Sequence, residues 1–338
     1  MVLESLFAVA LAGGWETHGP ELPNVTVVVT SAADDRRVYA LANDSSQAAI
    51  FRSDDAGQTW RKVFEAPPDE FLSTPLEVDP SNPDRLFAAT FQVIPSIPFS
   101  HSATRLYRSV DGADTWTVQL GVGDAALCSM AFGQPGAVYV ACRGRQPLFF
   151  RSEDGGDSFD GGWATFFGLG VPILATTPDE VLLSTSGWQS RDGGRTWQPW
   201  IDIPLNCALT SLAIDPSNSN RMFVSGGSTQ TFCGEVLRSM DGGVTWSRTT
   251  DVGGPVLDLV MDPSDPSLIY VSTAPVGRPG RVLVSDDEGD SWRDLGFPAS
   301  ASAKDLAITG NGERIYAATT TGVYTRSLLR TRVISPRP

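Results

Sequence analysis

The chain has 338 residues, 41% of them hydrophobic and 19% charged, with 33 glycines and 24 prolines. This composition predicts a globular protein rich in turns and excludes a disordered chain. The formal net charge of −14 excludes nucleic acid as the main partner, because phosphate binding needs a basic surface.

An apolar segment of sequence MVLESLFAVALAGG, residues 1–14, begins the chain. Ala-Leu-Ala before Gly13 suits signal-peptide cleavage, whereas Glu4 and the lack of a positively charged start do not. About ten apolar residues cannot span a bilayer, so a retained segment would dock on a partner or lie at a membrane surface.

One nine-residue phrase recurs along most of the remaining chain. Its six copies are RSDDAGQTW at 52, RSVDGADTW at 108, RSEDGGDSF at 151, QSRDGGRTW at 189, RSMDGGVTW at 238 and VSDDEGDSW at 284. Successive copies lie 38 to 56 residues apart, a period typical of propellers and solenoids.

Short apolar runs precede each copy, for example VLDLVMD, LIYVST and RVLVS before the sixth. Their alternation of β-branched and aromatic residues with polar ones predicts strands. A fourth strand begins at the tryptophan of the phrase, so each unit is expected to be a four-stranded antiparallel propeller blade.

Counting the units gives an all-β, seven-bladed propeller over residues 15–328. The last unit, DLAIT, RIYAATT and GVYTRS, stops at Ser327 without a phrase and lacks a fourth strand. Trp15, in GGWETHGPELP, stands where a phrase tryptophan would, so we expect the N-terminal strand to pair with the C-terminal blade and close the ring. A basic tail, residues 329–338, follows.

The phrase S-x-D-x-G-x-[TS]-W describes a self-satisfied turn. Its aspartate accepts turn N–H groups, its glycine takes a left-handed conformation, and its aromatic ring packs between blades. With these features the chain resembles the Asp-box, or bacterial neuraminidase repeat, propellers, from which Ala113 and Phe159 depart. The resemblance implies a structural role for six aspartates: Asp55, Asp111, Asp154, Asp192, Asp241 and Asp287. DDEGD at 286–290 resembles part of a calcium loop, but the spacing of an EF-hand is absent.

We expect function on the face opposite the boxes, where long connections gather. The connection over residues 91–105 is far longer than a hairpin needs, which is typical of functional loops. Apolar residues with scattered arginines suggest a partner-binding surface, with the alternative that the aromatics fold back over the blades. The candidates are Phe91, Val93, Ile94, Ile97, Phe99, Arg143, Arg145, Phe166, Phe167, Trp200, Phe232, Arg278 and Arg281, with Ile201 beside Trp200.

No catalytic set is apparent in the sequence. Sialidases of the Asp-box type need an arginine triad introduced by F/Y-R-I-P, which is absent, and a tyrosine nucleophile, whereas all six tyrosines here fall in predicted strands. His18 and His101 are the only histidines, too few for a histidine metal cluster. The prediction is therefore a protein that is not an enzyme and holds neither cofactor nor metal.

Four cysteines form two candidate pairs. If Phe132 pairs with Val138 in the hairpin CSMAFGQPGAVYVAC, Cys128 lies opposite Cys142, which is disulfide geometry. Cys207 and Cys233 open two strands of one blade and could also meet. Two disulfides would indicate an oxidising compartment, and buried free thiols are the alternative.

Among Asp-box propellers, the chain looks most like the seven-bladed assembly and stability factors of photosystem II. That resemblance implies an extracytoplasmic scaffold, periplasmic or lumenal, peripheral to the membrane and binding subunits of a membrane complex. A carbohydrate-binding propeller is the alternative, with Trp163, Trp188 and Trp200 as candidates for stacking on sugars, and a sialidase-like hydrolase comes third.

Overall fold

The computed structural model consists of β-strands and connecting turns throughout the part of the chain that it describes. Within that part, no helix is long and apolar enough to cross a membrane. The described residues are 14–17, 24–43, 48–95, 101–133, 136–144, 148–163, 174–176, 182–184, 188–199, 203–228, 230, 232–275, 277–298 and 302–328.

These strands form seven four-stranded antiparallel sheets. The first three are β2 Val25–Thr30, β3 Val38–Asn43, β4 Ala48–Ser53, β5 Arg61–Glu65; β6 Phe71–Asp79, β7 Asn82–Ile94, β8 His101–Ser109, β9 Thr117–Gly123; and β10 Ala125–Phe132, β11 Val138–Gly144, β12 Leu148–Ser152, β13 Asp160–Trp163. The next three are β14 Leu174–Thr176, β15 Leu182–Ser184, β16 Trp188–Ser190, β17 Gln198–Pro199; β18 Leu209–Asp215, β19 Asn218–Ser228, β20 Cys233–Ser239, β21 Ser247–Arg248; and β22 Val256–Met261, β23 Ile269–Thr273, β24 Arg281–Ser285, β25 Arg293–Asp294. The last sheet contains β26 Asp305–Ile308, β27 Arg314–Thr319, β28 Gly322–Ser327 and β1 Glu16–Thr17.

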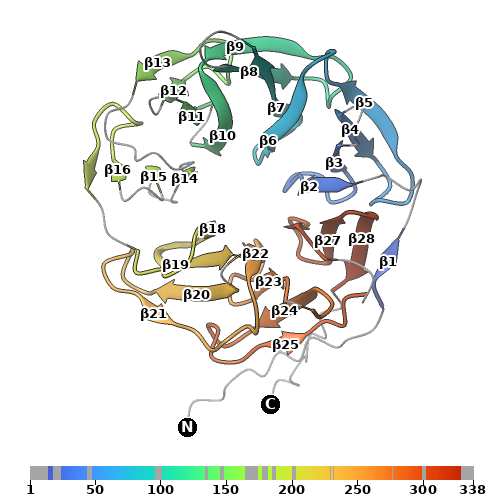
Figure 1. Cartoon of the computed structure of the whole chain (residues 1–338), viewed down its shortest axis with the longest axis vertical. Coiled ribbons are helices and arrows are strands. Elements are labelled where there is room, and N and C mark those ends of the chain that lie inside the picture. Colours follow the sequence, from blue (N-terminus) through green and yellow to red (C-terminus); the bar gives the residue numbers. More distant parts are fainter. Residues whose placement is uncertain are drawn as a thin grey trace, which may run out of the picture.

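The sheets are arranged around a ring (Figure 1), with β2, β6, β10, β14, β18 and β22 nearest its centre. The prediction of an all-β propeller built from four-stranded antiparallel blades is confirmed. Strand β1 pairs with β28, through Glu16 with Thr325 and Thr17 with Tyr324, so the two ends of the chain share one sheet. Trp15 packs edge-on against Phe297, with 4.8 Å between the ring centroids.

Apolar side chains between adjacent blades form the core. The cluster between the β2–β5 and β6–β9 blades includes Leu41, Ile50, Leu76 and Leu86, each at most 1% exposed. Tyrosines predicted in second strands are also core residues: Tyr39, Tyr270 and Tyr316 are fully buried in β3, β23 and β27.

The repeated phrase forms the same hydrogen-bonded turn in each copy. In the first, the Ser53 hydroxyl donates to Asp55 Oδ1 (2.8 Å) and accepts the Gly57 N–H (2.8 Å). The Thr59 N–H and hydroxyl donate to the two oxygens of Asp55 at 2.8 and 2.6 Å. Ala113, at the glycine position of the second copy, adopts φ of 75°, so the turn keeps its left-handed residue there without a glycine.

The predicted long loop over residues 91–105 is mostly strand, which corrects that expectation. Strand β7 continues to Ile94 and β8 starts at His101, with Phe91 opposite Thr104 and Val93 opposite Ser102. Apolar and β-branched residues favour this longer hairpin, because they pack well on a pleated surface. Only the residues between Ile94 and His101 connect the two strands.

Candidate functional site

The predicted partner-binding residues that the structure describes lie on the face opposite the boxes, where second strands end and third strands begin. The described ones are Phe91, Val93 and Ile94 on β7, Arg143 on β11, Phe232 before β20, Arg278 before β24 and Arg281 on β24. Six others lie outside the described residues: Ile97, Phe99, Arg145, Phe166, Phe167 and Trp200. Their role in binding a partner stays a prediction.

Two of these places expose apolar side chains. On the β6–β9 blade, Phe71 and Val93 are 54% and 52% exposed, and the rings of Phe71 and Phe91 lie 5.5 Å apart. On the β18–β21 blade, Phe232 is 62% exposed and has φ of 57°. Phe71, which the sequence analysis missed, is recognisable only from its pairing with Phe91 across the sheet.

A cavity of about 610 Å³ begins at Phe232. Its walls are Phe232, Gly234, Glu235 and Val236 from one side, and Arg248 with residues 249–255 from the connection to the next blade. A second cavity of about 390 Å³ adjoins it at Gly253 and is lined by Arg278, Arg281 and Phe297, among others. The structure therefore brings Phe232, Arg278 and Arg281 along one groove, which we call the rim groove.

Charged side chains in the rim groove are held in place. Arg248 Nη1 lies 2.5 Å from Glu235 Oε1, and Asn206 donates to Glu235 from its backbone N–H (3.1 Å) and its side-chain amide (2.8 Å). Burial acts to raise the pKa of Glu235, but the hydrogen bonds from Asn206 and Arg248 outweigh it and keep that pKa below its ordinary value. Glu235 is thus a fixed carboxylate.

Glycines allow the groove walls to pack closely. A Cβ added at Gly234 would lie 1.9 Å from the carbonyl oxygen of Gly254, and one at Gly254 would lie 2.9 Å from Cα of Pro275. Gly253 has φ of 78°, and its N–H donates to Asp251 Oδ1 at 2.7 Å. Arg281 Nη2 donates to the carbonyl of Val252 at 2.6 Å, which ties β24 to the same connection.

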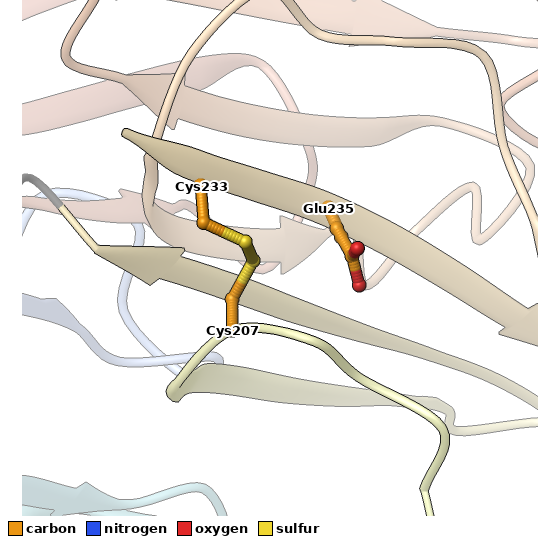
Figure 2. A group of neighbouring side chains, drawn as sticks. All are labelled: Cys207, Cys233 and Glu235. Carbon is orange, nitrogen blue, oxygen red and sulfur yellow. A yellow bond between two sulfur atoms is a disulfide. The ribbon is translucent and has the colours of Figure 1, made fainter. Parts of the chain in front are cut away.

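Both disulfides predicted from the cysteine spacing are present. Cys128 pairs with Cys142 across β10 and β11, in the predicted register, with 4.0 Å between their Cα atoms. Cys207 is joined to Cys233, and Glu235 follows two residues later on β20 (Figure 2). The second disulfide fixes the segment carrying Asn206 against the wall of the rim groove.

A separate cavity of about 600 Å³ occupies the centre of the ring and is lined by β2, β6, β10, β18, β22 and β26. Three carboxylates line it: Glu77, Asp258 and Asp305. Asp258 accepts the Ser211 hydroxyl (2.6 Å) and the Leu306 N–H (2.9 Å). These bonds link three successive blades.

Asp305 extends this linkage to the first blade, because its Oδ2 accepts the Val28 N–H at 2.8 Å. Burial raises the pKa of Asp258, and burial together with repulsion from Asp258 and Glu77 raises the pKa of Asp305 well above its ordinary value. Burial raises the pKa of Glu77 from 4.5 to about 7, and this carboxylate accepts no hydrogen bond from the residues that the structure describes.

These acids were missed in the sequence, although a signal exists. Each interrupts the apolar pattern of a first strand, in PLEVD, VLDLVMD and KDLAIT. A carboxylic acid that titrates near neutral pH beside further carboxylates is suited to donate or accept a proton in a reaction. None of the three is near a predicted site residue in sequence.

The chain is similar in sequence to two xyloglucanases. It is 25% identical over 233 residues to one from Paenibacillus sp, and 24% identical over 300 residues to one from Hypocrea jecorina. These matches cover 67% and 82% of the chain but only 20% and 33% of the relatives' own lengths. No protein-family model matches the chain.

Solved structures share the fold. A GH74 xyloglucanase from Xanthomonas campestris superimposes with a TM-score of 0.67 at 17% identity, over 97% of this chain and 55% of that one. YCF48 bound to D1 peptide superimposes with a TM-score of 0.63 at 15% identity, over 96% of this chain and 99% of that one. Both similarities therefore show that this chain shares the propeller fold of these proteins.

The xyloglucanase relatives overturn the prediction that the chain is not an enzyme. That prediction depended on the missing arginine triad and tyrosine nucleophile of sialidases and on the presence of only two histidines, which test for sialidase chemistry and for histidine-based chemistry. Most glycoside hydrolases need only two carboxylates on either side of the scissile bond. Such a pair has no fixed sequence spacing, so its absence could not be read from the motifs.

Proposed function

We propose that the chain is a carbohydrate-active propeller that binds a xyloglucan-type polysaccharide in the rim groove. The observation that carries the proposal is the groove itself, in which an exposed aromatic ring stands beside a fixed Glu235–Arg248 pair over two adjoining cavities. The xyloglucanase relatives supply the polysaccharide class. This choice takes up the carbohydrate-binding alternative, with Phe232 in place of the tryptophans named for it.

The chemistry of the groove suits a sugar chain. The exposed ring of Phe232 offers an apolar face for a sugar ring, while Glu235 accepts and Arg248 donates hydrogen bonds to hydroxyls. Because Asn206 and Arg248 already hold Glu235, little side-chain freedom is lost on binding. The cavities adjoin at Gly253, so consecutive sugars can occupy both.

Binding is tested by isothermal titration of the full chain with xyloglucan oligosaccharides, with affinity electrophoresis in xyloglucan gels as a second readout. Phe232→Ala should weaken binding about tenfold, equivalent to ~1.4 kcal/mol. Phe71→Ala is the matched control, because Phe71 is similarly exposed, at 54%, but lies on the β6–β9 blade. Absence of binding, or equal weakening by both variants, would overturn the proposal.

The proposal extends to hydrolysis in the cavity at the centre of the ring, which we call the central channel. Glu77, with a pKa of about 7, is suited to protonate a leaving oxygen, and Asp258 and Asp305 provide the further carboxylates that such a reaction needs. Release of reducing ends from xyloglucan should fall at least ~100-fold in Glu77→Gln, with binding in the rim groove unchanged. A Glu77→Gln variant as fast as the unaltered chain, or an unaltered chain that releases none, would refute this extension.

A second candidate function is that of an extracytoplasmic scaffold for a membrane complex. A separate observation supports it. The YCF48 structure that this fold matches over 99% of its length is a complex with a peptide, and Phe71 and Val93 expose apolar surface on the same face as the rim groove. The two disulfides support an oxidising compartment. Affinity purification from membranes in mild detergent should recover stoichiometric membrane subunits, and recovery of the chain alone would count against a scaffold.

A further inference from the structure

Three potential metal ligands meet at the wall of the β18–β21 blade. One ligand atom each from Cys207, Cys233 and Glu235 lies within 4.8 Å of the others, as Figure 2 shows for the side chains. Cys233 and Glu235 share a side of β20, because residues two apart in a strand point to the same face. Cys207 reaches them from the segment before β18. This segment packs closely on β19, because a Cβ added at Gly226 would lie 3.0 Å from the Cβ of Cys207.

The two disulfides differ in accessibility. Cys128 and Cys142 are 3% and 0% exposed and belong to the core between blades. Cys207 and Cys233 are both partly exposed, at the edge of the rim groove. Since thiol–disulfide exchange requires access of the attacking thiolate to a sulfur, the second disulfide is expected to be reduced first.

We propose that Cys207, Cys233 and Glu235 form a redox-gated zinc site that is closed in the disulfide form and opens on reduction. A dithiol breaks the sulfur–sulfur bond by giving two electrons and two protons to the cysteine sulfurs, and it leaves as its own disulfide. Zn²⁺ then displaces the two thiol protons and forms two Zn–S bonds and one bond to Glu235. The proposal does not depend on carbohydrate binding.

Ligand chemistry supports zinc rather than a harder cation. Two thiolates and one carboxylate are three protein ligands, to which a water adds the fourth corner of a tetrahedron. Asn206 donates to Glu235 at 2.8 Å and so orients its carboxylate, as ligand carboxylates usually are by neighbouring groups. Arg248, whose Nη1 lies 2.5 Å from the same carboxylate, carries a positive charge that competes with a metal cation.

The test uses the full chain, oxidised and after reduction with a phosphine, which takes up oxygen from water as it delivers two electrons. Thiol counting should show two reactive thiols before four. Zinc titration of the reduced chain should then give one ion per chain, and Co²⁺ in its place should show sulfur-to-metal charge-transfer absorption. The oxidised chain should bind neither ion.

Variants assign the ligands. Glu235→Gln should weaken zinc at least ~tenfold, Arg248→Gln should strengthen it, and Glu313→Gln, an exposed site on the last blade, should change nothing. Simultaneous release of all four thiols, equal zinc binding by the oxidised chain, or an unchanged affinity in Glu235→Gln would each overturn the proposal. The comparison of oxidised with reduced chain needs no variant, so it stands even if a substitution impairs folding.

Discussion

Replacing Glu77 by glutamine should make the protein more stable at neutral pH and leave its stability at acid pH unchanged. Glu77 lines the central channel, and burial raises its pKa from 4.5 to about 7. Glutamine keeps nearly the same shape but has no charge to desolvate. The carboxylate accepts no hydrogen bond from the described residues, so the substitution breaks none there.

The magnitude follows from linkage between protonation and folding. A folded-state pKa above the unfolded one means that the folded protein binds the proton more tightly, so the contribution to stability is complete below pH 4.5 and is lost as pH rises to about 7. A pKa difference of about 2.5 corresponds to ~3 kcal/mol. Removing the charge of Glu77 also relieves its repulsion of Asp305, which acts in the same direction.

Denaturant unfolding of the disulfide-bonded chain, followed by tryptophan fluorescence at pH values from 4 to 8, measures the effect. The free energies of unfolding of Glu77→Gln and the unaltered chain should agree near pH 4 and diverge by up to ~3 kcal/mol at pH 8. Glu313→Gln, at an exposed position, should show no such divergence. A difference that is the same at pH 4 and pH 8 would refute the reasoning, because a packing effect does not titrate.

Three further predictions concern the stability of the propeller. Hydrogen bonds, first from Thr115, lower the pKa of Asp111 to about 2, so the thermal midpoint of Asp111→Asn should lie below that of the unaltered chain at pH 7, and the gap should close as pH falls from about 4 to 2; a gap independent of pH would contradict this. Gly234→Ala places a Cβ 1.9 Å from a carbonyl oxygen and should lower the free energy of unfolding by ~1–3 kcal/mol, whereas Gly121→Ala, in open space, should change it by no more than ~0.5; equal effects would be inconsistent with crowding. Replacing Cys128 and Cys142 by serine opens a link between residues 14 apart and should lower the denaturant midpoint by the equivalent of ~3 kcal/mol, and an unchanged midpoint would argue against that link.

The fold could be predicted from the sequence because the nine-residue phrase is repeated along the chain. Each phrase marks a turn whose bonds are local, such as Ser53 to Asp55 and Thr59, so the turn forms in any blade regardless of its neighbours. Antiparallel register is equally local once one pair is assigned, which is why Cys128 could be placed opposite Cys142. The hairpin of β7 and β8 was misjudged because its length exceeds that of the other blades, and length alone suggested a loop.

The candidate sites could not be predicted in the same way, because they depend on contacts between blades. Phe232, Arg248 and Arg278 belong to different strands and connections, and only the packing of successive blades brings them to one groove. Glu77, Asp258 and Asp305 are far apart in sequence and converge only when the ring closes. A sequence motif is specific to one known mechanism. The absence of the sialidase residues therefore did not exclude glycoside hydrolysis by a pair of carboxylates.

The three acids of the central channel differ in the role that their contacts indicate, structural for two of them and functional for the third. Asp258 and Asp305 each accept an N–H from the next blade, at 2.9 and 2.8 Å, so folding alone accounts for a polar group at both positions. Glu77 accepts none from the described residues, and its burial makes the ionised form costly, which is typical of groups kept for function. If Glu77→Gln stabilises the protein at pH 8 and abolishes cleavage of xyloglucan, the destabilising carboxylate is the reaction's acid. If it stabilises the protein and cleavage continues, the channel serves assembly of the ring alone, and the reacting carboxylates must be sought in the rim groove.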